Sequence, residues 1–297
     1  MVSETRIVVV GSANADLHLT VDRLPATGAT VLADRTRWLP GGKGANQAAA
    51  AARLGAAVSL VAAVGDDPTA DVAVGGLAET GVSLDLLRRI PDTATGVAVV
   101  CVDAAGENLI VVSPGANAAL GSADVVLGAG CAAVLVSLEI PIATAQAALS
   151  GARQAGALAV LNAAPAERVT PALLAAADIL VANAGEAAML AADHDGDLAA
   201  LARSAGTTVV ATAGGDAVRA VTPEGDEHVV AARTVEVVDT VGAGDCFAAA
   251  LTVALVEHAE LDDALRFAAA ASGLKVGRLG ARSVPTRTEV DTFLAAG

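Results

Sequence analysis

Short apolar runs rich in β-branched residues recur along the chain, and longer alanine-rich stretches separate them. Runs of this kind are typical of strands that are buried on both faces of a parallel sheet. We expect such strands at 6–11, 58–65, 132–139, 158–162, 178–183 and 207–212. Apolar residues at helical spacing, each stretch ending near a glycine, predict helices at 47–54, 69–80, 143–155 and 198–204. This alternation predicts an α/β fold with a doubly wound, mostly parallel sheet flanked by helices.

Two regions, 16–38 and 95–113, alternate apolar and polar residues as solvent-facing strands do. A turn at Gly106-Glu107 would join two of these strands. We expect a single domain over 1–297, with a small β-sheet lid inserted from about 14–38 and 95–113. The exposed apolar face of such a lid needs a cover, so we also predict a homodimer that forms through it.

The composition narrows the classes of partner. Hydrophobic residues make up 54% of the chain, with three Phe, one Trp and no Tyr, which predicts an aliphatic core. A net charge of −15 disfavours nucleic acid and anionic membrane surfaces as partners. Cys101, Cys131 and Cys246 lack metal-site or redox-motif spacing, so we expect reduced thiols. The first six residues do not read as a signal peptide, and no apolar run is long enough to span a membrane, so we expect a cytoplasmic location.

The segment Gly242-Ala243-Gly244-Asp245 is the first candidate for chemistry. It follows what we expect to be the end of a strand at 235–240 and precedes an apolar helix at 247–257. The first N–H groups of a helix lack internal partners and attract anions, so this turn suits the γ-phosphate of ATP. Asp245 beside it is a candidate base for the proton of an attacking hydroxyl. The alternative is that Asp245 only caps the helix.

A second glycine-rich turn covers Gly41-Gly42-Lys43-Gly44-Ala45-Asn46. It is not a Walker A loop, because that motif requires a glycine at the position of Arg37. Close backbone approach together with a lysine and an amide suits the hydroxyls of a small sugar. A tight helix-entry turn with a surface lysine is the alternative. Asn14 and Asp16 follow the first strand, where open α/β sheets bind ligands, although a turn-forming Asx role is the default interpretation of such an isolated pair.

Taken together, these elements resemble the PfkB or ribokinase-like family of sugar kinases over nearly the whole chain. The matching segments are 11–16, 41–47, 65–67, 106–108, 115–120, 161–166 and 239–245. The resemblance is strongest to the ribokinase branch. It implies ATP-dependent transfer of the γ-phosphate to the 5-hydroxyl of D-ribose, giving D-ribose 5-phosphate. Fructose, 2-keto-3-deoxygluconate or nucleosides are the alternative substrates, and a non-catalytic sugar-binding sensor is an alternative of another class.

The resemblance also implies roles for individual residues. The catalytic set is Asp245 with Gly242, Ala243 and Gly244. The sugar-binding set is Asn14, Asp16, Gly41, Gly42, Lys43, Asn46, Glu139 and Asp245. Glu139 ends an apolar run, so it would project from the carboxyl edge of a strand, although a glutamate at a helix start before Pro141 is the alternative.

The cofactors implied are ATP, Mg²⁺ and an activating K⁺. The nucleotide set is Asn183, Glu186, Thr212, Gly214, Gly215 and Gly244, and Glu186 would also reach Mg²⁺ through water. Asp239, Val241, Gly280 and Ser283 would hold the monovalent cation. Ala184, Gly185 and Ala217 depart from the residues usual in the family. Cys246 is better explained as a buried thiol than as a nucleophile, because no histidine is spaced to activate it.

Overall fold

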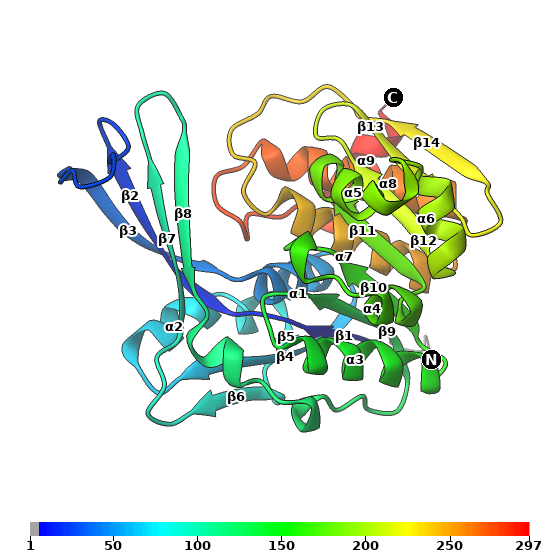
Figure 1. The fold of residues 1–297 in the computed structure, drawn as a ribbon, viewed down its shortest axis with the longest axis horizontal. Helices are drawn as coiled ribbons and strands as arrows, with labels where there is room; N and C mark the ends of the chain where they lie inside the picture. Colours follow the sequence, from blue (N-terminus) through cyan, green and yellow to red (C-terminus); the bar gives the residue numbers. More distant parts are fainter. Residues whose placement is uncertain (1–5, 297) are drawn as a thin grey trace.

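In this computed structural model, which describes residues 6–296, the strands form a large central sheet and a smaller separate one (Figure 1). The central order is β14 (Glu227–Ala231), β13 (Ala217–Val221), β12 (Thr208–Thr212), β11 (Ile179–Asn183), β10 (Leu158–Asn162), β9 (Cys131–Ser137), β1 (Arg6–Val10), β4 (Ala57–Gly65) and β5 (Val82–Ser83). A further strand, β6 (Leu87–Ile90), also pairs with β4. Among the strands of the described chain, only the pairs β12–β13 and β13–β14 are antiparallel in this sheet. The predicted mostly parallel α/β sheet is therefore confirmed.

Helices cover both faces of this sheet. They are α1 (Lys43–Arg53), α2 (Pro68–Val74), α3 (Ile142–Gln154), α4 (Pro171–Ala176), α5 (Ala184–Leu190), α6 (Leu198–Ala205), α7 (Ala243–Val256), α8 (Leu261–Val276) and α9 (Arg287–Ala295). Successive residues of a strand face opposite sides, and β1 shows this directly. Ile7 and Val9 join a core with α1, α7 and α8, whereas Val8 and Val10 join a core with α3, α4 and α6. The doubly wound arrangement follows from this alternation.

The second sheet, which we call the lid, has the order β3 (Ala33–Gly41), β2 (Asn14–Val21), β7 (Gly96–Val102) and β8 (Asn108–Ser113). Figure 1 shows its strands projecting away from the α/β body. Gly106 has φ +85° in the turn between β7 and β8, where we expected a turn. The lid strands arise from the two regions that alternated in the sequence, so the small second sheet is confirmed.

Two local predictions were wrong. The helix expected over 69–80 ends at Val74, because Gly75 and Gly76 interrupt it, and Gly76 has φ +76°. The strand expected at 235–240 does not form. The N–H groups of Val238 and Asp239 instead donate to the carbonyl of Val276, the last residue of α8, at 2.7 and 2.9 Å. Tertiary contacts with a helix end replaced sheet pairing there.

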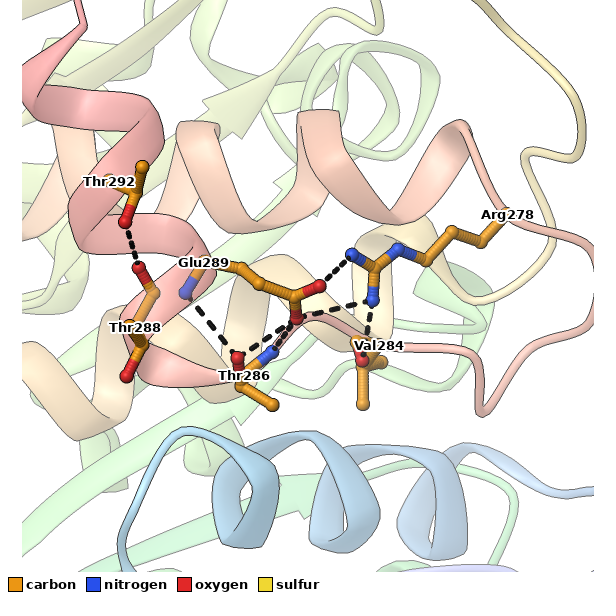
Figure 2. Close-up of polar contacts among 6 residues, drawn as sticks. All are labelled: Arg278, Val284, Thr286, Thr288, Glu289 and Thr292. Carbon is orange, nitrogen blue, oxygen red and sulfur yellow. Dashed lines mark hydrogen bonds and ion pairs between the residues drawn. The ribbon is translucent and has the colours of Figure 1, made fainter.

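The C-terminal helix α9 is tied to the loop that follows α8 (Figure 2). Thr286 and Glu289 form a reciprocal cap at the start of α9. Glu289 also accepts a hydrogen bond from the Arg278 guanidinium at 2.6 Å. Hydrogen bonds from Arg278 and Thr286 hold the pKa of Glu289 near 2. These contacts fix the path of the chain between the two helices.

Three further findings bear on the sequence analysis. All three cysteines are free thiols. Among residues 6–296, no helix has the length and apolarity to cross a bilayer. Residues 1–5, which include most of the segment in which we expect no signal peptide, lie outside the described part of the chain.

Candidate active site

The turn before α7 has the geometry of an anion site. Gly242 caps the helix with φ +77°, and a side chain there would bring its Cβ to 2.8 Å from the carbonyl oxygen of Ala281. Within the described chain, the N–H groups of Gly242, Gly244 and Asp245 have no intrachain acceptor. The N–H of Ala243, which we had grouped with them, donates to the carbonyl of Thr240 at 3.1 Å. Three free donors at a helix start therefore remain for an anion.

Asp245 lies in the first turn of α7 with only 7% of its surface exposed. Its Oδ2 accepts a hydrogen bond from Nδ2 of Asn46 at 3.1 Å, and its Oδ1 accepts one from Nε2 of Gln47 at 3.0 Å. Burial raises the pKa of Asp245, while the Lys43 ammonium and the two amides lower it. A buried carboxylate with a raised pKa is suited to receive a proton. Gln47, buried in α1, was missed in the sequence because nothing local distinguishes it from a helix-filling residue.

A cavity of about 390 Å³ opens beneath the lid. Asn14, Lys43 and Glu139 line it, together with Val112 from the lid strand β8. These side chains offer a carbonyl, an ammonium and a carboxylate, which are groups that bind hydroxyls. Five other residues of the predicted sugar set, Asp16, Gly41, Gly42, Asn46 and Asp245, are not in its lining.

Asp16 lies at the edge of this region and carries an orphaned buried oxygen. Its Oδ1 has no hydrogen-bond partner among the described residues. Burial, reinforced by the charge of Glu139, raises the pKa of Asp16 to about 7. A side chain at Gly41 would overlap the Asp16 carboxylate, which explains the glycine. The unpaired oxygen fits a ligand that donates a hydroxyl hydrogen bond.

Side chains around the smaller cavity hold its polar groups in place. Asn117 donates through Nδ2 to Oδ1 of Asn14 at 2.7 Å and accepts through Oδ1 from the N–H of Ala13 at 3.0 Å. Ser12 donates to Oε2 of Glu139 at 2.6 Å. Asn117 belongs to one of the segments that carried the family resemblance, but no role was expected for it from the sequence. Such contacts restrict the rotamers that a ligand would meet.

Lys43 lies where the small cavity meets a larger one of about 590 Å³, since it lines both. Burial alone would lower the pKa of Lys43, but the surrounding carboxylates, Asp245 foremost, raise it. Glu186 is the other charged residue shared by the two cavities. A fixed cation at this junction can neutralise charge on a group that passes from one cavity to the other.

The larger cavity contains all of the residues expected to bind a nucleotide. Its lining includes Asn183, Glu186, Thr212, Gly214, Gly215 and Gly244. Asn183 and Glu186 form a reciprocal cap at the start of α5, in which the N–H of Asn183 donates to Oε2 of Glu186 at 2.8 Å. Oε1 of Glu186 accepts no hydrogen bond from the described residues, so it can accept from a metal-bound water. Among the described residues, no group of three or more His, Cys, Asp or Glu could hold a metal ion by itself.

The residues expected to hold a monovalent cation lie together, but the oxygens of two of them, Asp239 and Gly280, are engaged. Oδ1 of Asp239 accepts from the N–H of Val241 at 2.9 Å, and Oδ2 accepts from the N–H of Gly280 at 2.7 Å. The carbonyl of Gly280 accepts from the N–H of Ser283 at 3.1 Å. The Lys275 ammonium lies 2.8 Å from the carbonyl oxygen of Asp239. These residues therefore do not form an open cage for an ion.

Arg282 is a partly buried arginine that the sequence analysis did not single out. Its guanidinium donates to the carbonyls of Gly41, Ala73 and Gly75 at 2.7 to 2.8 Å, and its Nε lies 3.3 Å from Oδ1 of Asn46. Burial lowers the pKa of Arg282 to about 10, so the group stays charged at neutral pH. Arg282 thus connects the loop after α8 to the Gly41–Asn46 turn.

Cys246 follows Asp245 and is fully buried. Burial raises the pKa of its thiol to about 12. A thiol with that pKa is not a nucleophile at neutral pH, which agrees with the interpretation of Cys246 as a packing residue.

Comparison with known proteins identifies relatives over the full chain. A family model described as pfkB family carbohydrate kinase matches residues 4–288. The ribokinase of Bacillus subtilis is 37% identical over 296 residues, which cover 97% of this chain and 99% of that protein. The deoxyribokinase of Salmonella typhi is 32% identical over 301 residues, covering 97% and 98%. The solved structure of Arabidopsis thaliana ribokinase complexed with ribose and ATP superposes with a TM-score of 0.87 at 31% identity, covering 98% of each chain.

Proposed function

The chain belongs to the pfkB family of carbohydrate kinases, and from that premise we propose that it transfers the γ-phosphate of ATP to the 5-hydroxyl of D-ribose. The product is D-ribose 5-phosphate. The observation that carries the proposal is the meeting of two cavities at Lys43, with Asp245 and the free N–H groups of the α7 turn beside it. Relatives named ribokinase support ribose as the sugar.

In the proposed reaction, Asp245 accepts the proton of the sugar hydroxyl as that oxygen attacks the γ-phosphorus. A new O–P bond forms, and the bond between the γ-phosphorus and the bridging oxygen of ADP breaks. The N–H groups of Gly242, Gly244 and Asp245 hold the transferring phosphoryl group, and Lys43 offsets its charge. These donors are already oriented by the helix start, so little reorganisation accompanies the transfer.

We propose that the smaller cavity binds the sugar. Asn14, Lys43 and Glu139 would contact its hydroxyls, and the unpaired oxygen of Asp16 would accept from another. Gly41 and Gly42 would contribute by letting the chain pass close to Asp16 and Asn14, and Asn46 would contribute through its hydrogen bond to Asp245. A side chain at Gly42 would place its Cβ 2.6 Å from the N atom of Asn14.

The larger cavity would bind ATP. Thr212, Gly214 and Gly215 would form one wall, and Phe247 and Val276 supply apolar surface for the base. Mg²⁺ fits this site, since Asn183 and Glu186 can order its waters beside the phosphates. When bound, Mg²⁺ would supply charge neutralisation on the nucleotide. A monovalent cation is not part of this proposal, because the oxygens of Asp239 and Gly280 are already engaged.

A sugar panel in a coupled assay of ADP release tests the substrate. The panel contains D-ribose, 2-deoxy-D-ribose, fructose, 2-keto-3-deoxygluconate and adenosine. We expect the highest kcat/KM with D-ribose. A higher kcat/KM with 2-deoxy-D-ribose would instead indicate a deoxyribokinase, the activity named for the Salmonella typhi relative. Binding of ribose without ADP formation would instead favour the non-catalytic sensor.

We also propose that two copies associate through their lids. Ile110, Val111 and Val112 of β8 are each about half exposed, as is Trp38 of β3. Val111 and Trp38 lie on one face of the lid, and Ile110 and Val112 lie on the other. Exposed apolar side chains on such a sheet favour burial against a second sheet. The three free thiols support a cytoplasmic location.

A further inference from the structure

Lys275 is a completely buried lysine, with 0% of its surface exposed. It lies in the last turn of α8. Its ammonium donates to the carbonyl oxygen of Asp239 at 2.8 Å and lies 3.4 Å from that of Arg278. Lysine is almost never fully buried unless it is paired, because its desolvation is costly. A buried ammonium held by backbone carbonyls therefore indicates a specific task.

The position of the ammonium connects it to the anion site. Asp239 begins the turn that leads through Gly242 into α7, the helix whose free N–H groups face the larger cavity. One turn earlier on α8, Ser272 donates through Oγ to the carbonyl of Ala243 at 2.9 Å. The last part of α8 thus holds this turn on both sides of Gly242.

Arg278, whose carbonyl is the second partner of the Lys275 ammonium, is itself held by its side chain. The guanidinium of Arg278 bonds to Glu289 and to the carbonyl of Val284, as Figure 2 shows. The loop then returns so that Ala281 lies against Gly242. We call residues 239–245 the anion turn. Lys275 therefore lies between the start of this turn at Asp239 and the loop from Arg278 to Ala281, which packs against Gly242.

Charge favours a cation at this place. Burial lowers the pKa of Lys275, but the nearby Asp239 carboxylate opposes this shift, and the carbonyl end of the α8 dipole also attracts positive charge. The carboxylate oxygens themselves accept from Val241 and Gly280, so they are committed to shaping the loops. The positive charge beside Asp239 is therefore supplied by the side chain of Lys275.

We propose that the Lys275 ammonium is the resident cation of the anion turn, in place of an exchangeable monovalent ion, so that this kinase works without K⁺. The inference rests on the proposed kinase function. Lys275 is a positioning residue: it touches neither substrate, and it acts through the carbonyls of Asp239 and Arg278. A tethered ammonium is present at every turnover, whereas a free ion must be bound.

The first experiment uses the wild-type protein. Activity is measured with its best sugar while KCl replaces tetramethylammonium chloride at constant ionic strength. We expect unchanged kcat and KM, and an unchanged Tm. Strong activation or thermal stabilisation by K⁺ would overturn the inference, and this result needs no variant to fold.

The second experiment removes the ammonium. Lys275→Met should lower kcat about 100-fold through misplacement of the donors, with a smaller change in the KM for sugar. Lys275→Ala should lose activity similarly, but K⁺ or NH₄⁺ should restore part of kcat and raise its Tm, whereas Li⁺ should not. Arg266→Met, which removes an exposed charge from the same helix, is the matched control and should behave as wild type.

Two outcomes separate this inference from the proposed function. A chain that phosphorylates none of the sugars refutes the kinase proposal itself. An active kinase in which folded Lys275→Met keeps full kcat, or in which Lys275→Ala shows no cation-specific rescue, refutes only the role of Lys275.

Discussion

Asn46 and Asp245 are 199 positions apart in the chain, and their side chains are joined by a hydrogen bond of 3.1 Å. The contact links the first glycine-rich turn, at the start of α1, to the second, at the start of α7. Asn46 in turn accepts from Arg282 through its other amide atom. The proposed base is therefore positioned by an element on the sugar side of the site.

Replacing Asp245 tests its role as the base. Asp245→Ala should fold and bind sugar but lose kcat by about 10²- to 10⁴-fold, because no other group receives the hydroxyl proton. Steady-state kinetics, calorimetric titration with ribose and circular dichroism measure the three properties. Cys246→Ala, at the adjacent buried position, is the control and should keep most activity. If Asp245 only caps α7, its loss would lower stability while kcat stays high.

Replacing Arg282 tests the connection between the C-terminal loop and the sugar turn. Arg282→Met leaves the carbonyls of Gly41, Ala73 and Gly75 without a donor, which should reduce the free energy of unfolding by about 2–4 kcal/mol. The KM for sugar should rise more than kcat falls, since Asn46 loses a partner. Urea denaturation and kinetics with varied sugar provide the measurements.

Arg282→Lys should not restore these properties, because a lysine cannot supply the planar fork of donors. Arg266→Met serves as the exposed control. An Arg282→Met protein with wild-type stability and KM would contradict the positioning role.

Asp16 should make sugar binding depend on pH. The pKa of Asp16 is raised to about 7 by burial and by the charge of Glu139. Its ionised form accepts hydroxyl hydrogen bonds best, so sugar affinity should rise between about pH 6 and pH 8. Asp16→Asn should remove this rise and weaken binding at all pH values. A flat pH profile in the wild type would count against a ligand-binding carboxylate here.

The same shift predicts how stability without sugar changes with pH. The pKa of Asp16 is about 7 in the folded protein, against 3.8 for an aspartate in an unfolded chain, so folding favours its protonated form. That contribution is fully present below pH 3.8 and is lost as the pH rises through 7. At about pH 8 the charged group should cost up to about 4 kcal/mol. Asp16→Asn should therefore raise Tm at alkaline pH and change it little in acid. The control Asp22→Asn, on an exposed loop, should leave Tm unchanged at both pH values.

The lid should mediate association. Ile110→Glu places a charge on a strand whose apolar side chains are exposed, and it should convert a dimer into a monomer. Light scattering at micromolar concentration measures the mass of each form. Glu107→Gln, in the turn of the same hairpin, is the control. A wild-type protein that is already monomeric would remove the lid dimer from consideration.

Several features were predictable because their signals are local. The apolar runs that became β1, β4, β9, β10, β11 and β12 identify buried strands by themselves. The Gly242–Asp245 turn was also recognisable, because glycines before an apolar helix mark a helix start. The roles assigned to the site residues stay predictions until the variants are measured.

Other features had no local signal. The absence of a strand at 235–240 depends on the carbonyl of Val276, which belongs to a distant helix end. Arg282 and Lys275 resemble surface residues in the sequence, and Gln47 resembles a helix filler. Each acquires its position from partners far away in the chain.

The sequence by itself determined the kind of fold, the location of its glycine turns and the family, since backbone preference and hydrophobic period act over a few residues. Only the tertiary structure decided which amides hold Asp245, which carbonyls Arg282 joins, and that a lysine lies beside Asp239. Those contacts form when helices and loops close on one another, because most polar groups that are buried in this way must form hydrogen bonds with a partner.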